Sequence, residues 1–98
     1  MMTQNANLYE SIINKYGRSA QTEKAIEELA ELIQALGKYR GLCFQGRLEE
    51  ASKEVDHIAE EIADVTIMLE QLKIMFDLDT EVNEWLDKKH DRIRGMVE

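Results

Sequence analysis

The sequence predicts an all-α fold in a single domain, residues 1–98, and three observations support that class. The chain contains no proline, so no residue of that kind interrupts a long helix. Apolar residues make up 44% of it, and good helix formers such as Glu, Leu, Ala and Lys are abundant. Several stretches repeat apolar residues every three or four positions, which is the period of an amphipathic helix.

The first two helices are expected over residues 5–16 and from Ser19 to about Lys38 or Arg40. Gly17 is a common type of stop residue, and the hydroxyl of Ser19 suits an N-cap. The apolar positions that define these helices are Leu8, Ile12 and Tyr16 in the first, and Ile26, Leu29, Ala30, Ile33 and Leu36 in the second.

Three glycines within ten positions, Gly37, Gly41 and Gly46, predict a loop before the third helix. That helix is expected to start between residues 48 and 53 and to continue to about Phe76. Its apolar residues alternate in steps of four and three, the pattern of a packing seam in a helix bundle. They are Ile58, Ile62, Val65, Leu69, Leu72 and Phe76.

A fourth helix is expected after a turn at residues 77–80, with Asp79 or Thr80 as its N-cap. It carries Val82, Trp85, Leu86 and Ile93. A chain this short buries only a modest fraction of its surface. The apolar residues on several faces of the third helix therefore predict that a partner subunit completes the core.

The net charge of −8 argues against non-specific binding to a nucleic-acid backbone. The single cysteine, Cys43, cannot form an internal disulfide, so a reducing cytoplasm is the expected location. Met1–Asn5 has neither a basic region nor an apolar run, so no signal peptide is expected. No apolar stretch approaches the ~20 residues of a membrane helix, and no membrane partner is expected.

Two acid pairs are the strongest chemical signal. Glu28 and Glu31 lie three residues apart in the second helix, and Glu61 and Asp64 lie three apart in the third. Residues at that spacing share a helix face. Two facing helices would thus bring four carboxylates together, and because like charges repel, a hard cation such as Mg²⁺ or Mn²⁺ would stabilise them.

The alternative is that these acids belong to solvated helix faces, as most helical glutamates do. The third helix argues against that alternative, because it is apolar nearly all round and Glu61 falls only ~40° from Val65 on a helical wheel. Glu28 and Glu31 are less clear, since they lie off the main apolar stripe of the second helix.

A second metal hypothesis concerns the two histidines. Glu54-x-x-His57 and Asp87-x-x-His90 imitate the Glu-x-x-His element of di-iron helix bundles, although the second lacks the glutamate. Neither segment is as apolar as the surroundings of Asp64, so both histidines are predicted to be spare surface residues.

The two acid motifs resemble those of the MazG-like nucleotide pyrophosphohydrolases, within the all-α NTP pyrophosphatase superfamily. The resemblance is carried by AIEELAEL over residues 25–32 and EEIADVTIMLEQL over residues 60–72, with a weaker likeness in the basic stretch 89–93. It spans about residues 16–94. It implies a four-helix MazG-like bundle unit that homo-oligomerisation completes, with a substrate pocket that borrows from a neighbouring copy.

The resemblance also implies an activity, the Mg²⁺-dependent cleavage of a nucleoside or deoxynucleoside triphosphate to its monophosphate and pyrophosphate. Glu28, Glu31, Glu61 and Asp64 would hold the metal ion, and one of them would act as general base toward the attacking water. Clean-up of the nucleotide pool is the role that the resemblance suggests. The sequence indicates no preference for a particular base.

A triphosphate substrate also requires cations, because phosphoryl transfer depends on positioning and charge. Lys38 and Arg40 beside the glycine-rich segment, and Lys89 and Arg92 on the fourth helix, are the candidates for substrate binding. Ordinary surface lysines and arginines would explain them equally well.

Two other functions compete with the enzyme hypothesis. A non-catalytic helical adaptor would account for the apolar seam of the third helix, but not for Glu61 and Asp64 on that helix. A protein that binds nucleotide or metal on the same scaffold without turnover would carry the same four carboxylates.

Overall fold

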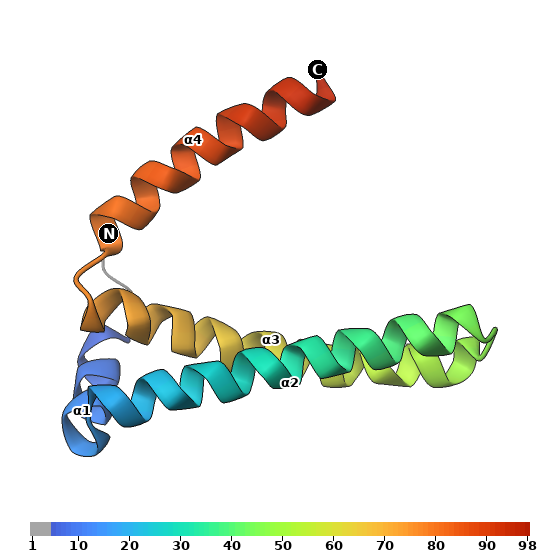
Figure 1. Cartoon of the computed structure of the whole chain (residues 1–98), viewed down its shortest axis with the longest axis horizontal. Helices are drawn as coiled ribbons and strands as arrows, with labels where there is room; N and C mark the ends of the chain where they lie inside the picture. The colour runs from blue at the N-terminus through green and yellow to red at the C-terminus, as the bar shows by residue number, and fades with distance from the viewer. Residues whose placement is uncertain (1–4) are drawn as a thin grey trace.

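The computed structural model describes residues 5–98, which form four helices and no strand (Figure 1). The helices are α1 (Ala6–Tyr16), α2 (Arg18–Phe44), α3 (Leu48–Met75) and α4 (Asp79–Val97). The all-α prediction is confirmed. No helix in this range combines the length and the apolar character that crossing a bilayer requires. Residues 1–4, part of the segment expected to lack a signal peptide, lie outside the described range.

Two glycines shape the turns at the ends of α2. Gly17, with φ of 94°, ends α1 and redirects the chain into α2. Gly46, with φ of 75°, lies in the three-residue turn 45–47 between α2 and α3. Residues other than glycine rarely adopt such backbone angles, so glycine at these two positions marks the turns.

The predicted loop over residues 37–46 is wrong for most of its length. α2 continues through Gly37 and Gly41 as far as Phe44. A glycine costs a helix about 1 kcal/mol relative to alanine. Packing compensates here, because α2 buries residues against the rest of the chain from Gln21 to Leu42.

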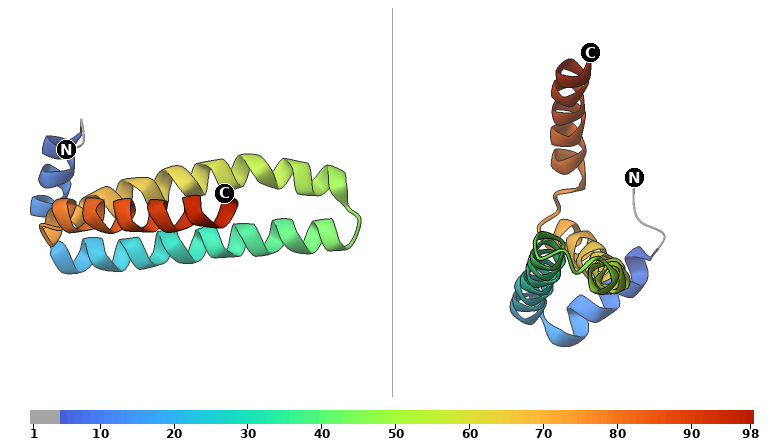
Figure 2. Two further views of the ribbon diagram at one scale, coloured as in Figure 1. Left: turned by 90° about the horizontal axis from the view of Figure 1, so that it is seen from above. Right: turned by 90° about the vertical axis from the view of Figure 1, so that its right-hand side faces the viewer.

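α2 and α3 form a long antiparallel hairpin, the main packing unit of the chain (Figures 1 and 2). Small side chains are the best buried in it, with Ala25, Ala35 and Ala51 each only 2% exposed. Small residues let two helices approach closely. Five polar residues are also buried along the hairpin, namely Gln21, Glu28, Glu54, Glu61 and Gln71.

The predicted apolar stripe of the second helix does not face α3. Ile26 and Ile33 are 63% and 69% exposed, and Leu29 and Leu36 are also exposed. On α3, Val65 is buried, while Ile62, Leu69 and Phe76 of the predicted seam are about half exposed. The face with Glu28 and Ala35 packs within the chain instead, and the stripe is left on the outside.

α1 and α4 have different relations to the hairpin. α1 lies across its end and contacts both long helices, and there the Arg18 guanidinium donates to the Met75 carbonyl oxygen. α4 touches only the end of α3 and then diverges from the hairpin (Figures 1 and 2). No residue of α4 is buried.

Candidate metal centre

The hairpin brings the four predicted carboxylates into two overlapping groups that share Glu61. Glu28, Glu31 and Glu61 each place one oxygen within 4.8 Å of the other two. Asp64 forms a similar group with Glu61 and with Glu60, an acid that the sequence analysis did not select. The three-residue spacing on two antiparallel helices produces this convergence, because each pair presents one face toward the same stretch of the interface.

Two of the carboxylates are buried with an oxygen unpartnered. Glu28 is 7% and Glu61 5% exposed. In each, Oε2 is buried and has no hydrogen-bond partner. A buried charge without a partner costs several kcal/mol unless a cation binds it. The donors are all oxygens, the ligands that Mg²⁺ and Mn²⁺ prefer, so these residues fit such an ion.

The raised pKa values of Glu31 and Asp64 reflect the same excess of negative charge. Burial raises the pKa of Asp64, and the charges of Glu28 and Glu60 raise it further. The charge of Glu28 is the main cause that raises the pKa of Glu31, with smaller effects from burial and Glu61. Both groups resist ionisation in the absence of a cation, and a bound cation would reverse that tendency.

A basic side chain four residues earlier lies against each of the two buried glutamates. Lys24 Nζ lies 3.0 Å from Glu28 Oε1, and His57 Nε2 lies 3.2 Å from Glu61 Oε1. In both cases the oxygen that remains unpartnered is Oε2. The sequence places Lys24 on the same helix face as Glu28 and Glu31 without giving it a role, and the pairing of His57 with Glu61 was not predicted. A basic residue four positions before a buried acid is a usable signal for both contacts.

His57 is not a spare surface histidine, as the sequence analysis predicted. Its ring is half exposed, but Nδ1 also lies 2.7 Å from Oε1 of the buried Glu54. Hydrogen bonding to Glu54 raises the pKa of His57, and the same bond lowers the pKa of Glu54. His90 is exposed on α4, as predicted, so no di-iron arrangement joins the two histidine segments.

The predicted substrate-binding cations are divided between three places. Lys38 lies near the centre, with Nζ 3.3 Å from Glu54 Oε2. Arg40 lines a shallow hollow further along α2, beside Phe44. Lys89 and Arg92 are exposed on α4, and within one chain the structure does not bring them to the carboxylates.

Other hollows adjoin the hairpin. One, between α1, α2 and α3, is largely apolar and has a volume of about 460 Å³. Tyr9, Tyr16, Gln21, Lys24, Met68 and Gln71 are among the residues that line it. At its polar spot, Gln21 Nε2 donates to Gln71 Oε1 over 2.7 Å.

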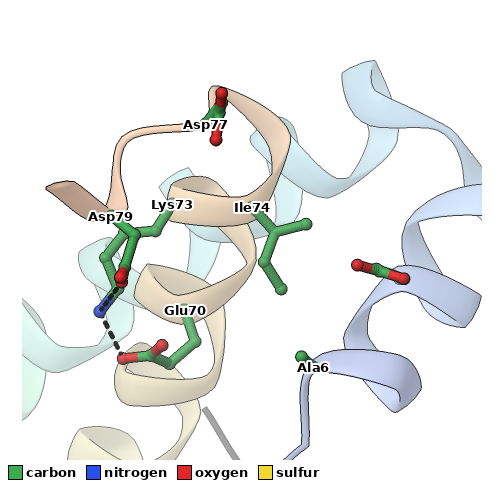
Figure 3. A pocket seen from close by; sticks show the side chains of 7 residues that line it. Ala6, Glu70, Lys73, Ile74, Asp77 and Asp79 are labelled. Carbon is green, nitrogen blue, oxygen red and sulfur yellow. Dashed lines mark ion pairs between the residues drawn. The ribbon is translucent and has the colours of Figure 1, made fainter. Parts of the chain in front are cut away.

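Another hollow lies near the end of α3 (Figure 3). There Lys73 Nζ lies 2.9 Å from Glu70 and 3.8 Å from Asp79, so these two acids already have a cation. It is separate from the metal centre.

Comparison of the chain with models of known protein families, with curated proteins and with solved structures finds no match. The resemblance to MazG-like enzymes therefore rests on the two acid motifs of the sequence alone.

Proposed function

We propose that this protein is a Mg²⁺-dependent nucleoside triphosphate pyrophosphohydrolase of the MazG-like type, acting on ribo- or deoxyribonucleotides in nucleotide-pool clean-up. One observation carries the proposal, two overlapping groups of carboxylates from α2 and α3 that share Glu61, with a buried, unpartnered oxygen on Glu28 and on Glu61. A scaffold that only needed solubility would not bury two carboxylates with one oxygen of each left unpartnered, since their desolvation is costly.

The reaction divides into tasks that these residues fit. Water attacks the α-phosphorus, the bond to the β-phosphate oxygen breaks, and the monophosphate and pyrophosphate form. One carboxylate of the cluster accepts the proton of the water and passes it to solvent. Mg²⁺, when bound, would neutralise phosphate oxygens and orient the water. Glu28, Glu31, Glu61 and Asp64 are the ligands proposed to hold it.

We also infer that the working form is a homodimer or homotetramer. The chain exposes 7641 Å², whereas a compact protein of its mass exposes roughly 5,800 Å². The surplus is accompanied by the exposed stripe of α2 and by the unburied α4. Contact with a second copy would cover these faces and would let Lys89 and Arg92 reach a neighbour's centre. A reducing cytoplasm suits the lone thiol of Cys43.

The first test is pyrophosphate release from a panel of NTPs and dNTPs with Mg²⁺, repeated with EDTA and with Asp64→Asn. We expect release that chelation and the substitution both abolish. The matched control is Asp56→Asn, which makes the same change at an exposed position of α3 and should leave turnover intact. No release from any nucleotide by the folded, Mg²⁺-loaded protein would overturn the enzyme proposal.

An adaptor remains the competing function, because its partner would also cover the exposed stripe of α2. The two proposals differ in their response to metal. Only the enzyme, or a non-catalytic protein that binds nucleotide or metal on the same scaffold, should gain thermal stability from Mg²⁺ through Glu28 and Glu61.

A further inference from the structure

A polar hollow of about 360 Å³ continues from the metal centre toward the far end of the hairpin. Glu31 and Glu61 border it at the centre, so the two features share a wall. Its remaining polar lining comes from Gln34 and Lys38 on α2 and from Glu54 and His57 on α3. Lys38 follows Glu31 by seven residues and Glu54 precedes Glu61 by seven, about 10 Å along each antiparallel helix.

Glu54 organises the cations of this hollow. It is 7% exposed, and both of its oxygens are engaged, Oε1 by His57 and Oε2 by Lys38. Both carboxylate oxygens of Glu54 are therefore already paired within the chain, and Glu54 does not have to bind a ligand itself. His57 in turn reaches Glu61 through Nε2, so one buried acid fixes a chain of contacts that ends at the metal centre.

Lys38 is the group in the hollow that can meet an incoming anion. Its side chain is 66% exposed although Glu54 holds its ammonium. An ammonium has three donors, so contact with one carboxylate leaves donors for a second acceptor. Three carboxylates, Glu31, Glu54 and Glu61, border the same space. A free anion would be repelled there more strongly than an anion whose charge Mg²⁺ partly neutralises.

The opposite side of the metal centre has a contrasting character. The apolar hollow lined by Tyr9, Tyr16 and Met68 lies on that side, next to Lys24. Such a lining suits a flat nucleobase and not a phosphate chain. With its base toward the apolar hollow and its phosphates toward the polar hollow, the triphosphate has one favourable orientation across the metal centre.

We propose that the polar hollow receives the two terminal phosphates of the substrate, which leave as pyrophosphate, with Lys38 as their direct contact and Glu54 and His57 as positioning residues. The inference rests on the proposed function and specifies which part of the substrate lies where. When the α–β anhydride breaks, its electron pair remains on the β-phosphate oxygen, and the Lys38 ammonium stabilises that charge. His57 holds Oε1 of Glu61 and leaves Oε2 for the metal ion.

The test measures binding of inorganic pyrophosphate by calorimetry, with Mg²⁺ and with EDTA. We expect binding to the wild-type protein only with Mg²⁺, and affinity about 10- to 100-fold lower in Lys38→Met and in Glu54→Gln. Lys53→Met, the same change at an exposed lysine of α3 outside the hollow, should bind as the wild type does. Affinity for Mg²⁺ alone should be unchanged in Lys38→Met, which separates a phosphate contact from damage to the metal centre.

His57 has a test of its own. His57→Leu should lower both Mg²⁺ affinity and pyrophosphate affinity, and His57→Gln, which retains a donor, should restore part of each. If Lys38→Met and Glu54→Gln bind Mg²⁺-pyrophosphate as tightly as the wild type, the subsite assignment is overturned while hydrolysis still supports the enzyme. If the folded protein neither hydrolyses a triphosphate nor binds Mg²⁺-pyrophosphate, both proposals fail together.

Discussion

Glu28 and Glu61 have the same arrangement on two different helices. Each gives Oε1 to a basic side chain one turn earlier and keeps Oε2 buried without a partner. The flanking basic side chain restricts the rotamer of the carboxylate. The unpaired oxygen is therefore oriented for metal binding before an ion binds. Preorganisation of this kind reduces the entropic cost of binding.

Neutralising one of these carboxylates should stabilise the metal-free protein. In Glu61→Gln the shape and the acceptor for His57 remain, while the repulsion from Glu28 and Glu31 is removed. We expect a gain on the order of 1 kcal/mol without metal, or a Tm about 4–8 °C higher, and loss of the Mg²⁺-induced rise in Tm. Glu49→Gln, an exposed acid in the first turn of α3, is the control. A lower Tm in EDTA for Glu61→Gln would show that Glu61 is already compensated.

The raised pKa values of Glu31 and Asp64 predict an unusual pH dependence. Because each group binds its proton more tightly in the folded state than in the unfolded state, the metal-free fold should gain stability as pH falls through the raised folded pKa values. His57, whose pKa is also raised, stabilises the fold when protonated and so acts in the same direction. Protons compete with Mg²⁺, so the stabilisation by Mg²⁺ should shrink over the same range.

Thermal unfolding from pH 8 to about pH 5, with EDTA and with Mg²⁺, measures both trends. Parallel curves in the two conditions would contradict the assignment of Glu31 and Asp64 to the metal centre.

At the level of whole helices, α2 contains the clearest departure from its own sequence signals. It extends through Gly37 and Gly41, which the sequence pattern assigns to a loop. Of the three glycines in that segment, only Gly46 has the left-handed backbone of a turn. Gly37→Ala should therefore stabilise the protein by about 0.5–1 kcal/mol, because it removes conformational freedom from the unfolded chain. Gly46→Ala should destabilise it, since alanine is strained at φ of 75°. Chemical denaturation of both variants tests the helix boundary, and a loss of stability in Gly37→Ala would favour the loop.

The same element shows how far sequence reasoning extends. Residue spacing was enough to predict four helices and to pair Glu28 and Glu31 with Glu61 and Asp64. Spacing could not show which face of α2 packs against α3. A face rich in alanine and glutamate resembles a solvent-exposed face, and only the acids on the facing helix distinguish it. His57 was misjudged for that reason, because its partner Glu54 is buried where Ala35 and Lys38 line the same hollow from α2.

Considered as a whole, one copy of the chain resembles part of a larger core. The stripe with Ile26 and Ile33 and the helix α4 have no cover within the chain, and most of the stability of a helix in a protein comes from packing of its apolar face. Ile33→Glu should therefore dissociate the oligomer, because it places a charge in the buried contact. Light scattering after gel filtration measures the mass, with Asn7→Glu on the exposed part of α1 as the control of equal charge. A wild-type protein of monomeric mass would refute the oligomer.

The single thiol of the chain, Cys43, lies near the distal end of α2, about 18 Å beyond Glu31 along the helix axis. A nitroxide label attached there sits far from the metal centre and needs no engineered cysteine. Pulsed electron paramagnetic resonance on the labelled protein would then report one inter-label distance for a dimer, several for a tetramer and none for a monomer. Repeating that measurement with Mn²⁺ in place of Mg²⁺ would add the distance from each label to the paramagnetic ion, and so locate the ion on the hairpin.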